Sequence, residues 1–165
     1  MTWTDPTTQT TGNLITAATW NNEVVENLVH LRERVFESIY YFDSHHSNTD
    51  YRGASMGSPR RVTFELPSDF QEIESVSVLI LAVSTETVTL NLSLSYGLED
   101  EAKDTNTESL SGQAVLVEAD THHTLDVTSM FDEVQAGHIC GLECTRTSGN
   151  ANSLLLGLRV RYTRG

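Results

Sequence analysis

The stretch TVTLNLSLSY, residues 87–96, alternates strictly between polar and apolar side chains. A period of two sends successive side chains to opposite faces of a β-strand. We therefore predict a strand here, with one face in a core and the other in water. The apolar residues of this strand are Val88, Leu90, Leu92, Leu94 and Tyr96.

The same kind of pattern extends along the chain on both sides of this strand. Residues 61–66 alternate in the same way, and residues 75–84 form a longer apolar run. Further short candidates lie at 114–118, 124–128, 139–145 and 154–163. About seven short strands at this spacing are typical of a β-sandwich. We predict that residues 61–165 form a mainly β domain with jelly-roll topology.

Residues 17–42 show a different period, which predicts one long α-helix. Apolar residues from Val24 to Val35 follow each other in steps of four, three and four, and so narrow a stripe is typical of a coiled-coil seam. Such a helix would be roughly 39 Å long and marginally stable alone in water. Because the rest of the chain predicts strands, we expect copies of this chain to be its partners. The predicted oligomer interface consists of Val24, Leu28, Leu31, Val35 and Phe42.

Two polar segments flank the predicted helix. Residues 1–16 are rich in Thr and are interrupted by Pro6 and Gly12, and a segment of this composition does not fold on its own. We therefore predict an extended arm that attaches to a partner. Residues 43–60 are rich in Ser, Gly, Asp and Asn, which predicts a linker to the β domain. The apolar anchors proposed for attachment are Trp3, Leu14, Ile15 and Trp20.

The composition argues against two classes of partner. A formal net charge of −13 over 165 residues disfavours nucleic acid, since binding to phosphates requires a basic surface. No run approaches the roughly 18 apolar residues that a membrane helix needs, and the residues after Met1 do not resemble a signal peptide. We expect neither a nucleic-acid nor a membrane partner.

The cysteine and histidine residues give no strong signal of a metal site. Cys140 and Cys144 share one face of a predicted strand and are about 13 Å apart along it. That is too far for a disulfide, so we predict two buried thiols. Residues 45–46 and 122–123 are pairs of adjacent histidines, whose rings would point to opposite faces of a strand. We interpret them as solvent or interface histidines. Metal binding is the alternative for both residue types.

The segment 98–112 is predicted to be a long acidic loop. We interpret it as a solvated tip, at the end of the β domain away from the N-terminal arm. Calcium binding is the alternative, although the D-x-[DN]-x-[DN]-G pattern is missing. The acidic residues of this segment are Glu99, Asp100, Glu101, Asp104 and Glu108.

The sequence carries no recognisable catalytic motif. It contains no G-x-S-x-G, H-E-x-x-H, phosphate-loop or dinucleotide-binding pattern. We therefore expect a protein without enzymatic activity, catalytic residues, cofactor or bound metal. An aromatic platform for sugars is not marked either, because Trp3 and Trp20 precede the predicted β domain. We expect residues 40–42 to pack the end of the helix against the sandwich.

Two parts of the sequence resemble structural proteins of tailed-phage virions. In the N-terminal part, Trp3-Thr4 is followed by GNLITAATWN at residues 12–21. In the C-terminal part, GHICGLECTR at 137–146 and LGLRVRY at 156–162 are similar to the last two strands of small jelly-roll domains in such proteins.

This resemblance implies a non-enzymatic virion surface component, either a capsid decoration or a short fibre, that is commonly trimeric. Its N-terminal region would hold it on other virion proteins, such as the major capsid protein. The alternative is a tail or baseplate adhesin, or a carbohydrate-binding module, that recognises glycans on a host surface. The resemblance carries over no catalytic residue.

Overall fold

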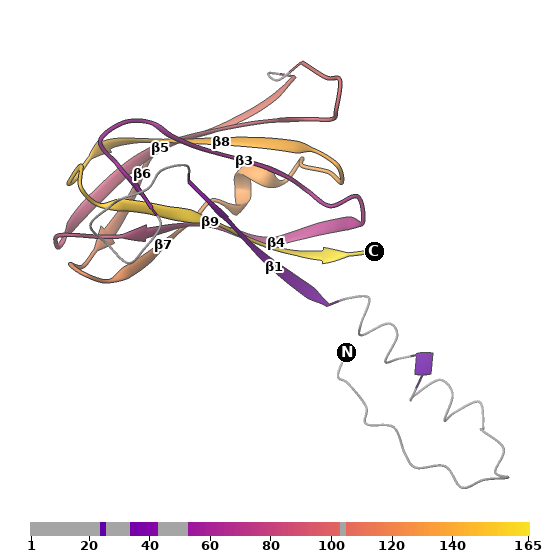
Figure 1. The fold of residues 1–165 in the computed structure, drawn as a ribbon, viewed down its shortest axis with the longest axis horizontal. Helices are drawn as coiled ribbons and strands as arrows, with labels where there is room; N and C mark the ends of the chain where they lie inside the picture. Colours follow the sequence, from indigo (N-terminus) through magenta and orange to yellow (C-terminus); the bar gives the residue numbers. More distant parts are fainter. Residues whose placement is uncertain (1–23, 26–33, 43–52, 103–104) are drawn as a thin grey trace, which may run out of the picture.

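Two stacked antiparallel sheets make up most of this computed structural model, which describes residues 24–25, 34–42, 53–102 and 105–165 (Figure 1). One sheet has the order β1 (Val35–Tyr41), β9 (Leu154–Arg164), β4 (Phe70–Leu81) and β7 (His122–Asp126), with the short β2 (Ala54–Ser55) also paired to β9. The other has the order β3 (Arg60–Glu65), β8 (Ile139–Ser148), β5 (Glu86–Gly97) and β6 (Asn106–Val117). A short 3-10 helix, η2 (Thr128–Phe131), follows β7.

The strands pair as a nested series. β5 pairs with β6, β4 with β7, β3 with β8 and β1 with β9, all antiparallel. The first half of the sandwich sequence therefore runs against the second half like one long hairpin, and successive pairs alternate between the two sheets. This is the arrangement of a jelly roll. The prediction of a mainly β sandwich with that topology is confirmed.

The core lies between the sheets and is filled by alternate residues of the strands. All five apolar side chains of residues 88–96 are at most 5% exposed in β5, as their alternation predicts. Val62, Phe64 and Leu66 are buried in the same core. Their polar neighbours in β3 and β5 face the solvent, so the outer face of the four-stranded sheet is polar.

Strand β1 corrects the last part of the helix predicted over residues 17–42. Val35–Tyr41 is extended and pairs with β9 along its whole length. Its inward residues include Phe36 and Tyr40, which pack against the core, and the ring of Tyr40 stacks on Phe64 with centroids 4.5 Å apart. Aromatic residues favour strands, and burying them stabilises a core strongly. The aromatic alternation of this segment therefore outweighs the helical spacing that ends at Val35.

The predicted helical seam loses two of its residues to the sandwich. Phe42 is 2% exposed in the core, and Val35 belongs to β1. Val24 is partly buried in the described pair 24–25. The remaining seam and anchor residues lie outside the described residues, so the oligomer and attachment hypotheses stay predictions. These residues are Leu28, Leu31, Trp3, Leu14, Ile15 and Trp20.

Two predicted connections are shorter in the structure. Part of the predicted linker 43–60 belongs to the sandwich, since it contributes β2 and the first residue of β3, and Ala54 and Met56 are buried. The predicted acidic loop 98–112 ends early, because β6 begins at Asn106 and pairs with β5. β6 is an edge strand with mostly exposed side chains, which is why its sequence looks like a loop.

The cysteine prediction is confirmed. Cys140 and Cys144 are both free and buried on the inner face of β8. Burial raises the pKa of each thiol to about 12, so both are protonated near neutral pH. Among the described residues, no helix has the length and apolar character needed to cross a membrane.

Candidate binding groove

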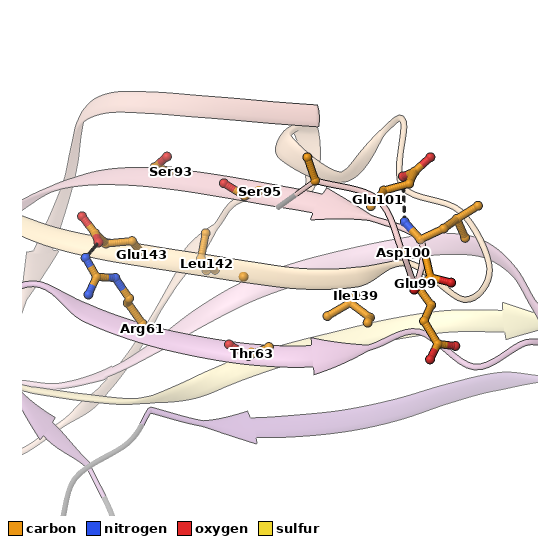
Figure 2. A pocket seen from close by; sticks show the side chains of 14 residues that line it. Arg61, Thr63, Ser93, Ser95, Glu99, Asp100, Glu101, Ile139, Leu142 and Glu143 are labelled. Carbon is orange, nitrogen blue, oxygen red and sulfur yellow. Dashed lines mark hydrogen bonds and ion pairs between the residues drawn. The ribbon is translucent and has the colours of Figure 1, made fainter. Parts of the chain in front are cut away.

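A groove of about 540 Å³ crosses the outer face of the four-stranded sheet (Figure 2). Small-molecule sites typically have volumes of about 300–1,000 Å³. Strands β3, β8 and β5 form the floor of the groove, and the loop that follows β5 forms one wall. The lining residues are Arg61, Thr63, Ser93, Ser95, residues 97–102, Ile139 and residues 141–143.

The absence of a side chain at Gly141 makes the sheet surface hollow at its centre. The strand registers place Thr63 of β3 and Ser95 of β5 on either side of this glycine. The neighbours of Gly141 in β8, Cys140 and Leu142, are buried in the core, so position 141 belongs to the outer face. A glycine between two short hydroxyl side chains therefore leaves a depression that a ligand can enter.

An ion pair lies at one end of the groove. Arg61 Nη2 contacts Glu143 Oε2, and the two residues are direct cross-strand partners on β3 and β8. Ser93 lies on the other side of Glu143. The side chain of Arg61 is 76% exposed and that of Glu143 is 32% exposed, so both remain accessible. Surface pairs of this kind add little stability, and the main effect of this one is to orient two charged groups.

Three carboxylates lie at the other end, on the loop after Gly97 (Figure 2). They belong to Glu99, Asp100 and Glu101. Glu101 folds back, and its Oε2 accepts a hydrogen bond of 2.8 Å from the backbone N–H of Leu98. A Cβ atom at Gly97 would lie only 2.9 Å from that oxygen, so the glycine permits this closure. Asp100 has a φ of 72°, a left-handed conformation that Asp tolerates better than most residues.

Apolar side chains border the carboxylate end of the groove. Leu98 is 48% exposed and Ile139 is 44% exposed, and both line the groove. A site that combines apolar surface with a few oriented polar groups is typical of small-molecule binding.

The acidic loop does not lie at the end of the sandwich that we predicted. β1 begins beside the end of β9, and β4 begins there too. A short turn joins the end of β3 to the start of β4, so β3 ends at this same end of the sandwich. The last residues of β3 and of β5 both pair with the first residue of β8, so β5 ends there as well. The loop after β5 is therefore at the end where β1 enters the sandwich.

The five acidic residues predicted for this segment are divided in the structure. Glu99, Asp100 and Glu101 line the groove, whereas Glu108 lies in β6 and Asp104 is outside the described residues. In the part of the chain that the structure describes, no group of three or more His, Cys, Asp or Glu side chains is placed to hold a metal ion.

The histidine and cysteine candidates that the structure describes do not line the groove. His122 and His123 belong to β7, in the other sheet. The Nε2 atom of His123 accepts a hydrogen bond of 2.8 Å from the backbone N–H of Glu118, which secures the turn before β7. The buried cysteines face the core, and residues 45–46 are outside the described residues.

The central groove residues were not predicted from the sequence. Thr63, Ser95 and Gly141 come from three separate strands and meet only through the strand registers. One signal was available, because a lone glycine inside an alternating strand marks a close approach or a missing side chain. Gly141 fits that description, but the sequence does not say which residues would flank it.

The chemistry of the groove suits a polar ligand with many hydroxyl groups. Ser and Thr hydroxyls both donate and accept hydrogen bonds, carboxylates accept them, and the guanidinium group donates them. The lining residues include neither His nor Cys. The groove therefore presents both donors and acceptors of hydrogen bonds to a ligand.

No protein-family model and no curated protein matches the chain. Among solved structures, the chain is similar to the xylan-binding module CBM15, with 14% identity, a TM-score of 0.44, and coverage of 79% of this chain and 97% of that one. It is also similar to a carbohydrate binding module from the glycoside hydrolase family 9 protein Cel9A of Ruminococcus flavefaciens FD-1, with 14% identity, a TM-score of 0.33, and coverage of 78% and 100%.

A third similarity is to dimeric latent PorU from Porphyromonas gingivalis, with 12% identity and a TM-score of 0.38. It covers 79% of this chain but 13% of that protein. Similarities at these levels say nothing about what this chain binds.

Proposed function

We propose that this chain is a non-catalytic module that binds an oligosaccharide in the groove across β3, β8 and β5. The observation that carries the proposal is the composition of the groove. Hydroxyl, carboxylate and guanidinium groups surround the depression at Gly141, on the solvent-facing side of a sheet whose other side is core.

Sugar hydroxyls match these groups in chemistry. A carboxylate can accept hydrogen bonds from two adjacent hydroxyls, and an Arg side chain can donate to sugar oxygens. Such charge-assisted hydrogen bonds are stronger than neutral ones. The Arg61–Glu143 pair and the bond from Leu98 N–H to Glu101 already orient three of the charged side chains, so binding orders few additional groups.

The charge of the groove favours a neutral ligand over an anionic one. Four carboxylates line it, those of Glu99, Asp100, Glu101 and Glu143, against the one guanidinium of Arg61. The whole chain also carries a formal net charge of −13. A uronic or sialic acid would bring a further negative charge close to these carboxylates, and like charges repel at such range.

A glycan array probed with the full chain tests the proposal. We expect binding to neutral oligosaccharides and none to matched glycans that carry uronic or sialic acid. Glu143→Gln should lower the affinity for the bound glycan by about tenfold, the effect of one hydrogen bond to a charged group. Glu72→Gln is the matched control, because Glu72 is an exposed carboxylate of β4 in the other sheet. An array without any binding would overturn the proposal.

The N-terminal sequence favours a second role that is compatible with the first. Trp3-Thr4 and GNLITAATWN at 12–21 resemble tailed-phage virion proteins, so the module would be carried as a homo-oligomer on a capsid, short fibre or tail. We then expect mass spectrometry of purified particles to detect the chain, and antibody labelling in micrographs to separate capsid from tail. Particles that lack the chain, from cells that express it, would contradict this role.

A further inference from the structure

A second hollow adjoins the groove on the other side of β3. It has a volume of about 470 Å³ and is lined by Tyr41, Pro59, Arg60, Arg61, Val62 and Thr63. Two of these residues, Arg61 and Thr63, also line the groove. Because β3 is an edge strand of its sheet, a ligand can pass from the groove over this edge into the second hollow.

Tyr41 presents an aromatic ring beside the second hollow. It is 56% exposed, whereas the next residue, Phe42, is 2% exposed in the core. The preceding residue, Tyr40, stacks on Phe64. The alternation of β1 thus places two aromatic side chains of residues 40–42 inside and leaves the ring of Tyr41 outside. A tyrosine ring has apolar faces and a polar hydroxyl, which matches a sugar ring with its C–H face and its hydroxyl edge.

Two arginines line the second hollow together with Tyr41. Arg60 is held in place, because its Nε donates a hydrogen bond of 2.8 Å to the carbonyl oxygen of Ser55 and its Nη2 lies 3.4 Å from Ser55 Oγ. Arg61 is oriented by Glu143. Both arginines therefore line the second hollow in fixed conformations, and the carboxylates of residues 99–101 lie at the far end of the groove.

We propose that the groove and the second hollow form one continuous site for a linear, neutral oligosaccharide, in which Tyr41 stacks on a sugar ring that the groove alone does not reach. This inference rests on the proposed function. It predicts a dependence on ligand length. A disaccharide fills the groove, and a longer oligomer crosses β3 and gains the contact with Tyr41.

Titration calorimetry with the full chain tests this dependence. The probes are the disaccharide, tetrasaccharide and hexasaccharide of the neutral glycan that binds best on the array. We expect the longest oligomer to bind the unmodified chain about tenfold more tightly than the disaccharide, the effect of one aromatic contact. Tyr41→Ala should remove this gain and leave disaccharide affinity unchanged, and Tyr41→Phe should keep it.

Ile39→Ala is the matched control for Tyr41→Ala. Ile39 is 37% exposed and lies two residues earlier on the same face of β1, but it lines neither hollow. This variant should bind every oligomer as the unmodified chain does. The inference is overturned if affinity does not rise with length, or if Tyr41→Ala changes the affinity for all oligomers equally or for none. Failure of every oligomer to bind the unmodified chain would instead overturn the proposed function itself.

Discussion

Replacing Gly141 with leucine is expected to weaken oligosaccharide binding strongly while the domain stays folded. The new side chain would rise from the floor of the groove between Thr63 and Ser95, where the proposed ligand lies. A bulky group in that place excludes a sugar ring. We expect a loss of affinity of about a hundredfold, or about 2.8 kcal/mol of binding free energy.

The stability of this variant should equal or exceed that of the unmodified chain. A Cβ atom at position 141 would meet only the carbonyl oxygen of Ser95, at 3.9 Å, which is ordinary van der Waals contact. Glycine within a strand is less favourable than alanine by roughly 0.5–1 kcal/mol. Thermal denaturation should therefore give an unchanged or higher midpoint, which separates a blocked groove from an unfolded domain.

Gly57→Leu is the matched control for this experiment. The substitution is the same, and a Cβ atom there has only Ser55 Oγ near it, at 3.8 Å. Gly57 does not line the groove, so this variant should bind as the unmodified chain does. If Gly141→Leu also retains full affinity, the groove on the outer face of β8 is not the binding site.

The sandwich itself was predictable because polar and apolar residues alternate along several of its strands. Residues 88–96 bury every second side chain, and a strict period of two over this length is typical of a half-buried strand. The same holds for Val62 and Phe64 in β3. Even the same-face burial of Cys140 and Cys144 followed from their spacing on a strand.

The first strand was missed because two periods compete in one segment. The steps from Val24 to Val35 fit a helix, but Phe36, Tyr40 and Phe42 occupy alternate positions that fit a strand. Where the intrinsic preferences of a segment for helix and for strand compete, tertiary packing decides which structure forms. Here β9 supplies a partner for the whole of β1, and its register cannot be read from either sequence alone.

The candidate site was less predictable than the fold. Its floor depends on which residue stands opposite Gly141, and a register shifted by one residue would send the side chains of Thr63 and Ser95 into the core. The sequence predicts the acidic cluster at residues 99–101 that forms one wall of the groove. It does not predict at which end of the sandwich this cluster lies. For Tyr41 the sequence predicts packing with its two aromatic neighbours at a helix end, whereas the alternation of strand β1 leaves it exposed.

Replacing Phe42 with alanine is expected to lower the free energy of unfolding by about 3–5 kcal/mol, the usual cost of removing a buried phenylalanine ring. The side chain is 2% exposed in the core between the sheets. Urea denaturation followed by circular dichroism measures the effect. Tyr41→Ala is the matched control. Tyr41 precedes Phe42 and is 56% exposed, and surface substitutions usually change the free energy of unfolding by no more than about 0.5 kcal/mol.

The dependence on protein concentration decides between the two assignments of Phe42. If its ring lies in the core of one chain, the destabilisation is the same at every concentration, because Phe42→Ala then leaves any association of copies unchanged. If the ring lay in a helical seam between copies, Phe42→Ala would weaken their association. The unmodified chain would then gain more stability from association than the variant does, and the loss would grow with concentration. We expect the same loss from low to high micromolar concentration. A loss that is small at low concentration and grows as concentration rises, with Tyr41→Ala unaffected, would return Phe42 to the predicted oligomer interface and remove it from the sandwich core.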